Sequence, residues 1–140
     1  MRRSAYTSVI LLALLPAACG SDKIPEILRG VSAGGGYWGA CPPPQWVPKN
    51  DRLAISPEFN DRLAARYPAG SPESRLIEDL TRQGFKDSGG CESAPSIRFL
   101  TFHAEGIGLV VSAITAQAYW QADPQSRIVW TKGFVAYTGL

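Results

Sequence analysis

The sequence has 140 residues, with 14 lysines and arginines against 12 aspartates and glutamates. This length suits one small domain with a modest core. The near balance of charge argues against a nucleic-acid-binding protein, which needs a strongly basic surface.

The first predicted element is a three-part leader. Arg2 and Arg3 form a basic start, residues 9–15 are apolar, and two alanines follow. This layout is typical of a secretory signal, and the apolar run is shorter than the roughly 20 residues of a membrane-spanning helix. We therefore expect a signal peptide at residues 1–18 and export from the cytoplasm. Loss of Arg2 and Arg3 leaves 12 basic and 12 acidic residues, a formally neutral mature chain.

Cys19 follows the leader as in a bacterial lipoprotein. The sequence Ala17-Ala18-Cys19 resembles a lipobox, in which the cysteine receives a diacylglycerol, although Pro16 stands where the pattern prefers an aliphatic residue. The alternative is ordinary signal cleavage after Gly20. Because no polybasic patch is present to hold anionic lipid, membrane attachment would depend on acyl chains such as palmitate.

Cys41 and Cys91 remain as a pair once Cys19 is set aside. In an oxidising compartment such a pair usually forms a disulfide. Closing a loop of about 50 residues contributes on the order of 4 kcal/mol in the chain-entropy model. The alternative is a metal site, but the chain has one histidine and no Cys-x-x-Cys spacing, so we expect neither a metal nor another cofactor.

Residues 19–50 are rich in glycine and proline and are expected to form a flexible arm, with the part near Cys41 lying against the domain. Within it, residues 30–34 read GVSAG and match the Gly-x-Ser-x-Gly pattern of hydrolases. That pattern needs a strand before Ser32 and a helix after it, and neither is expected. His103, the sole histidine, is predicted to be an ordinary strand residue. We expect no enzyme activity.

Two helices are predicted from the sequences SPEF at 56–59 and SPES at 71–74. In each, the serine is expected to cap the helix, the proline to take the first helical position and the glutamate to lie at the positive end of the dipole. The first helix should end near Tyr67. Its apolar face is predicted to comprise Phe59, Leu63 and Tyr67.

The second helix is predicted to direct Leu76, Ile77 and Leu80 inward and to end at Gly84. With Gly84 at C′, Phe85 should contact Leu80 in a Schellman motif. The charged side chains of this helix are expected to form a solvated outer face: Glu73, Glu78, Asp79 and Arg82.

Three strands are predicted after the turn-rich residues 86–96. They are residues 97–105, 108–123 and 127–139, where β-branched and aromatic residues gather. Turns at Glu105-Gly106 and at residues 123–126 would make an antiparallel meander. The alanines within residues 108–118 would also suit a helix, and Gly133 is predicted to mark a bulge.

The predicted fold is α+β. Two short helices would pack on a three-stranded antiparallel sheet as a two-layer sandwich, in a domain of residues 51–140. Strand alternation cannot place Tyr119 and Trp120 on one face, so at least one should point away from the helices. Aromatic residues in small domains usually fill the core, but an exposed one is a candidate partner contact. The candidates are Tyr119, Trp120 and Trp130.

The leader and this order of elements resemble the small outer-membrane lipoproteins of the SmpA/OmlA (BamE-like) type. The resemblance covers residues 56–140, and Gly70-Ser71 followed by Leu76 and Leu80 is similar to the family's Gly-x-Thr helix opening. It implies a non-enzymatic protein, lipid-anchored to the outer membrane and facing the periplasm, that contacts envelope proteins. Gly20 after Cys19 is similar to the pattern of outer-membrane sorting. The alternatives are a soluble periplasmic or secreted location and an inhibitor or ligand-binding lipoprotein acting on a hydrolase or cell-wall component.

Overall fold

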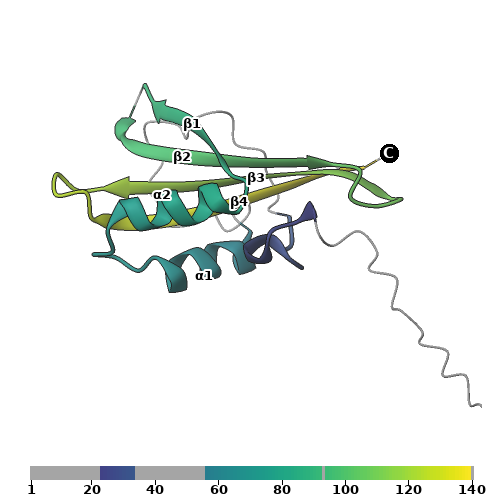
Figure 1. Ribbon diagram of the computed structural model, residues 1–140, viewed down its shortest axis with the longest axis horizontal. Coiled ribbons are helices and arrows are strands. Elements are labelled where there is room, and N and C mark those ends of the chain that lie inside the picture. The colour runs from purple at the N-terminus through teal and green to yellow at the C-terminus, as the bar shows by residue number, and fades with distance from the viewer. Residues whose placement is uncertain (1–22, 34–55, 93, 140) are drawn as a thin grey trace, which may run out of the picture.

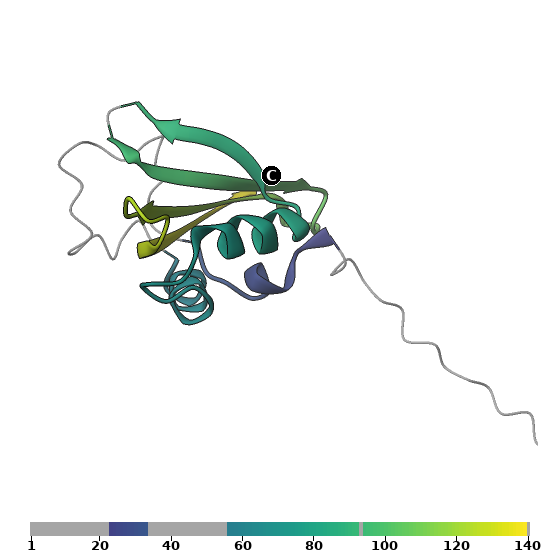
Figure 2. The same ribbon diagram turned by 60° about the vertical axis from the view of Figure 1, so that its left-hand side comes forward.

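A computed structural model of the chain describes residues 23–33, 56–92 and 94–139. The elements in order are η2 (Glu26–Leu28), α1 (Pro57–Arg66), α2 (Glu73–Arg82), β1 (Lys86–Cys91), β2 (Ala94–Glu105), β3 (Val111–Ala122) and β4 (Ile128–Gly139). The strands form one antiparallel sheet in the order β1-β2-β3-β4, and η2 and both helices lie on one side of it (Figures 1 and 2). The α+β class is therefore confirmed.

The sheet has four strands, so the prediction of three was wrong. The additional strand, β1, lies in the turn-rich segment that was expected to be a loop, and it pairs with β2 through Lys86↔Thr101 and Asp87↔Leu100. Five of its six residues are exposed, and the register shifts between Asp87 and Gly90. Because backbone pairing rather than side-chain burial makes this segment a strand, hydrophobic alternation carried no signal for it.

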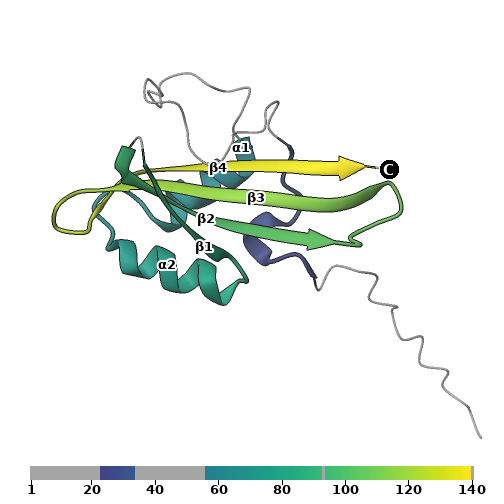
Figure 3. The ribbon, with the colours of Figure 1, turned by 90° about the horizontal axis from the view of Figure 1, so that it is seen from above.

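Residues 111–122 form a strand, which settles the ambiguity between helix and strand in this segment. Two of the alanines that also suited a helix, Ala116 and Ala118, are buried strand residues packed beneath the helices. Gly133 pairs with Ala118 in an unbroken register, so the predicted bulge is absent at that position. Seen from above, the strands lie side by side in sequence order (Figure 3).

Gly133 is instead the place where α1 meets the sheet. A Cβ added to Gly133 would lie 2.5 Å from Cδ1 of Phe59, and the Gly133 carbonyl accepts a 2.9 Å hydrogen bond from the backbone N–H of Ser56. Ser56 occupies the N-cap position of α1, but its side chain makes no capping bond. The predicted hydroxyl cap was therefore wrong, although the helix begins where expected.

The start of α2 is held by hydrogen bonds to the β3–β4 turn and to the first residue of β4 rather than by a serine cap. The carbonyl of Ser71 accepts from the backbone N–H of Ile128 at 2.8 Å, and the N–H of Glu73 donates to the carbonyl of Ser126 at 2.9 Å. Pro72 is the N-cap residue, without a side-chain bond. These backbone bonds take the place of the predicted Ser71 cap.

The end of α2 confirms the Schellman motif. Gly84 has a φ of +93°, its N–H donates to the carbonyl of Thr81, and the N–H of Phe85 donates to the carbonyl of Leu80, each at 3.0 Å. Leu80 and Phe85 are both buried. The two predicted turns are also confirmed, since β2 ends at Glu105 and the turn between β3 and β4 includes residues 123–126.

The main core lies between the helices and the sheet. It contains the predicted apolar faces of both helices: Phe59, Leu63, Tyr67, Leu76 and Leu80 are buried, and Ile77 is partly buried against them. It also contains residues from the segment that was expected to be a flexible arm, namely Ile27, Leu28 and Val31. The core therefore starts earlier in the sequence than the expected domain boundary at residue 51.

A second cluster lies on the other face of the sheet and contains Cys91, Phe99, Tyr119 and Phe134. Tyr119 and Trp120 point to opposite faces, as strand alternation requires, and both are buried. Tyr119 stacks on Phe99 with the ring centroids 4.9 Å apart. The sheet is therefore apolar on both faces over these residues.

The leader (1–18), Cys19 and Cys41 lie outside the described residues, and their predicted roles stay predictions. Cys91 is buried and disulfide-bonded, and its pairing with Cys41 stays a prediction. None of the helices within residues 23–33, 56–92 and 94–139 has the length and apolar character of a membrane span.

Candidate functional site

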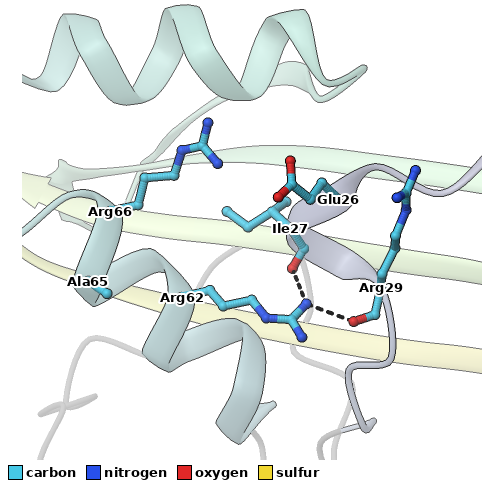
Figure 4. A pocket seen from close by; sticks show the side chains of 6 residues that line it. All are labelled: Glu26, Ile27, Arg29, Arg62, Ala65 and Arg66. Carbon is cyan, nitrogen blue, oxygen red and sulfur yellow. Dashed lines mark hydrogen bonds between the residues drawn. The ribbon is translucent and has the colours of Figure 1, made fainter.

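The candidate site is a groove between η2 and α1, which we call the η2–α1 groove. It has a volume of about 560 Å³. It is lined by Glu26, Ile27, Arg29, Arg62, Ala65 and Arg66 (Figure 4). A second hollow of about 580 Å³ shares Glu26 and Arg66 with it and extends to the end of α2. The groove therefore lies between the N-terminal segment and α1, and the second hollow continues it to α2.

Arg62 holds the two walls of the groove together. Its Nη1 donates to the backbone carbonyls of Ile27 at 3.0 Å and Arg29 at 2.8 Å (Figure 4). These carbonyls lie at the end of the short η2 helix, where acceptors lack partners within the helix. Burial of Ile27 and Leu28 in the core fixes η2 from the other side. Both walls of the groove are therefore held in place by hydrogen bonds and core packing.

Arg66 marks the boundary between the groove and the second hollow, and Asp79 of α2 orients it. Its guanidinium donates to both oxygens of Asp79, at 2.7 and 3.3 Å, which is the bidentate arrangement of a strong pair. The hydroxyl of Tyr67 donates to the same carboxylate at 2.7 Å. This network joins α1 to α2.

The network shifts the pKa of each member. Burial opposes ionisation of Asp79, but the hydrogen bonds from Tyr67 and Arg66 outweigh it and hold the pKa of Asp79 below its usual value. The hydrogen bond to Asp79 raises the pKa of Arg66. Burial, with the bond to Asp79, raises the pKa of Tyr67 well above that of a free tyrosine. All three groups therefore keep their usual charges near neutral pH.

Positive charge dominates the two hollows. Among their lining residues, five are cationic and two are anionic. The cationic ones are Lys23, Arg29, Arg62, Arg66 and Arg82, and the anionic ones are Glu26 and Asp79. Arginine guanidinium groups bind carboxylates through paired hydrogen bonds. Arg66 and Arg82 already pair with Asp79, so a carboxylate-bearing ligand would bind through Lys23, Arg29 and Arg62.

The predicted aromatic contacts are not exposed in the way that a partner site needs. Trp120 is buried on the helix side, where its Nε1 donates to Glu73 at 2.9 Å. Tyr119 is buried on the other face. Trp130 is partly buried, and its Nε1 donates to Gln121 at 2.6 Å. Tyr119 and Trp120 therefore belong to the core, and we no longer expect them to contact a partner.

The predicted solvated face of α2 is only partly present. Glu78 and Arg82 are exposed, but the side chains of Glu73 and Asp79 are only 15% and 13% exposed. Glu73 accepts from Arg98 at 3.1 Å as well as from Trp120, so it connects α2 to the sheet. Sequence periodicity missed both roles because the partners come from other elements.

Ser32 and His103 do not share a hydrogen-bond network. The hydroxyl of Ser32 donates to Glu58 at 2.6 Å, and this bond lowers the pKa of that carboxyl, which makes it a weak base. The His103 ring is hydrogen-bonded to Thr115 at 2.9 Å. Among the described residues, Ser32 and His103 therefore have separate side-chain partners, Glu58 and Thr115. In the part of the chain that the structure describes, no group of three or more His, Cys, Asp or Glu residues could hold a metal ion.

The arginines of the groove were missed at the sequence level, although a signal existed. Arg62 and Arg66 are four residues apart and therefore share one face of the predicted first helix. The opposite wall could not be anticipated, because residues 26–29 were interpreted as part of a flexible arm.

No protein-family model, curated protein or solved structure matches this chain.

Proposed function

We propose that the protein is a non-enzymatic, lipid-anchored periplasmic protein that binds an acidic segment of another envelope protein in the η2–α1 groove. The observation that carries the anchor is the sequence Ala17-Ala18-Cys19 at the end of a secretory leader. The resemblance to SmpA/OmlA-type lipoproteins supports sorting to the outer membrane. It also makes a protein of the barrel-assembly machinery the first partner to test.

The groove supports the binding part of this proposal through its charge and shape. Arg29 and Arg62 lie on opposite walls of a surface that carries more cations than anions. A carboxylate entering the groove would meet the Arg62 guanidinium, which its hydrogen bonds to the η2 backbone hold in place, and this limits the entropy lost on binding. A partner with an extended acidic segment fits this arrangement best.

The anchor is tested by mass spectrometry of the mature N-terminus. We expect a first residue Cys19 with added acyl mass, and loss of membrane association when Cys19→Ala is exported in its place. An unmodified N-terminus beyond Cys19 would contradict the anchor and favour a soluble periplasmic or secreted protein.

The groove is tested with a photoreactive amino acid at Ala65, which lines it. The matched control is the same amino acid at Ala64, an exposed neighbour on α1 that does not line it. We expect an envelope protein to be crosslinked from position 65 only, and less of it in an Arg29→Glu background. Equal crosslinking from both positions would contradict the groove as a binding site. A soluble hydrolase as the crosslinked product would instead support the inhibitor alternative.

A further inference from the structure

The loop between β2 and β3 exposes two adjacent apolar side chains, which we call the apolar tip. Leu109 is 92% exposed and Val110 is 79% exposed, the highest values among the exposed large hydrophobic residues of the described chain. Single exposed apolar residues are common on soluble proteins. Two adjacent ones at the end of a hairpin form a contiguous apolar patch, the kind of surface that marks contact with a protein or a membrane.

The start of the described chain lies at the base of this loop. A Cβ added to Gly106, the first loop residue, would lie 3.7 Å from Nζ of Lys23. Figures 1 and 2 show the N-terminal segment, in purple, beside the end of the sheet that carries this loop. Cys19 precedes Lys23 by four residues, which span at most about 14 Å when extended. An acyl group on Cys19 would therefore bring this end of the molecule to the bilayer.

We propose that the apolar tip inserts into the lipid bilayer in which Cys19 is anchored, an inference that rests on the lipid anchor of the proposed function. Leu109 and Val110 would enter the boundary between headgroups and acyl chains, where apolar side chains are favoured. The ammonium of Lys23 at the base of the loop would lie at the level of the lipid phosphates.

An acidic residue near the tip, Glu105, limits how deeply the tip can insert. Glu105, at the end of β2, has a side chain that is 82% exposed and lies 3.5 Å from the His103 ring. Its carboxylate is disfavoured in the apolar part of a bilayer, so only the tip itself enters. The β3–β4 turn at the other end of the sheet then points away from the membrane, so the strands extend outward from the bilayer surface.

The test uses the full chain, exported, acylated and reconstituted into vesicles of phosphatidylethanolamine and phosphatidylglycerol. An environment-sensitive fluorophore is attached to Leu109→Cys, and the unsubstituted chain reports background labelling. Val129→Cys is the control, because Val129 is another exposed apolar residue, 47% exposed, and lies at the start of β4 near the opposite end of the sheet. We expect a blue shift and quenching by nitroxides on the acyl chains at position 109 and neither effect at position 129.

Two outcomes overturn the proposal separately from the anchor. If the mass of the N-terminal peptide shows an acylated Cys19 while the label at position 109 stays in water, tip insertion is wrong and the anchor stands. If the label is shielded only after an envelope extract is added, the tip binds a protein. An unacylated Cys19 overturns the anchor itself and removes the premise of tip insertion with it.

Discussion

Asp79 shows how a single helix carboxylate takes its role from its neighbours. The local sequence places it among the charged residues of α2, but Tyr67 and Arg66 of α1 both donate to it. Hydrogen bonds to a charged group contribute about 1.5–3 kcal/mol. The contribution of Arg66 is smaller, because its side chain is 42% exposed and water screens the pair.

We predict that Asp79→Asn lowers the free energy of unfolding by about 1–2 kcal/mol at pH 7. Because folding lowers the pKa of Asp79, its contribution is present above the unfolded pKa of about 4 and is lost as pH falls through the folded value. Urea denaturation of both proteins at pH 7 and near pH 3 checks this. Glu78→Gln, at an exposed position of the same helix, should have almost no effect. An equal penalty at both pH values would argue against the charged network.

Gly133 is the residue where a single added methyl group should matter most. Its Cβ would lie 2.5 and 2.8 Å from two atoms of the Phe59 ring and 3.1 Å from the backbone nitrogen of Asn60. We predict that Gly133→Ala lowers the free energy of unfolding by about 1–3 kcal/mol through overpacking. Thermal unfolding measures the effect.

The control for this substitution is Gly90→Ala in β1. The nearest atom to an added Cβ at Gly90 is the Ile97 carbonyl oxygen at 3.9 Å, an ordinary contact. We expect a change within about 0.5 kcal/mol, as for most surface substitutions. If Gly133→Ala were as mild as Gly90→Ala, α1 would not pack on β4 as described.

At the scale of elements, α2 is attached to the sheet through its first residue as well as through its apolar face. The Glu73 carboxylate accepts from Trp120 on β3 and from Arg98 on β2. The Arg98 guanidinium carbon also lies 5.4 Å from the centre of the Trp120 ring, within the range of a cation–π contact. This arrangement fixes the N-terminal end of α2. Backbone hydrogen bonds to residues 126 and 128 hold the same end.

We predict that Glu73→Ala lowers the free energy of unfolding by about 2–3 kcal/mol, because it leaves the indole N–H of buried Trp120 without its acceptor. Glu73→Gln should recover part of the loss, since an amide oxygen still accepts. Glu78→Ala is the control from the same helix. Denaturant titrations of the three variants give the comparison, and similar values for Glu73→Ala and Glu78→Ala would refute the attachment.

At the scale of the whole molecule, the N-terminal segment is part of the domain. Leu28 is 1% exposed and belongs to the same core cluster as the apolar faces of α1 and α2. Arg62 adds two hydrogen bonds from α1 to the backbone of this segment. The groove therefore exists only when residues 26–29 are docked.

We predict that Leu28→Ala lowers the free energy of unfolding by about 2–5 kcal/mol, as expected for a buried leucine. Leu109→Ala removes the same atoms from an exposed leucine and should have almost no effect. Chemical denaturation distinguishes the two. If Leu28→Ala were as mild as Leu109→Ala, the segment would be a detachable arm, as first expected.

The sequence alone determined the features that depend on neighbours within one turn of chain. These are the helix positions, the apolar faces led by Phe59 and Leu76, the Schellman ending at Gly84 and the turns that separate β2, β3 and β4. Each follows from periodicity or from the backbone preference of one residue. Of the candidate site, only the Arg62 and Arg66 pair on one helix face was accessible in this way.

Tertiary structure alone decided the rest, because the partners are far apart in the sequence. Trp120 lies 47 residues from Glu73, and Arg62 lies 35 residues from the carbonyl of Ile27. The strand β1 exists because β2 offers it backbone partners, and Tyr119 is buried because the second face of the sheet also carries an apolar cluster. Polar and glycine-rich segments carry no local signal for such contacts. A contact between distant residues contributes stabilising free energy only when the complete fold brings both partners together.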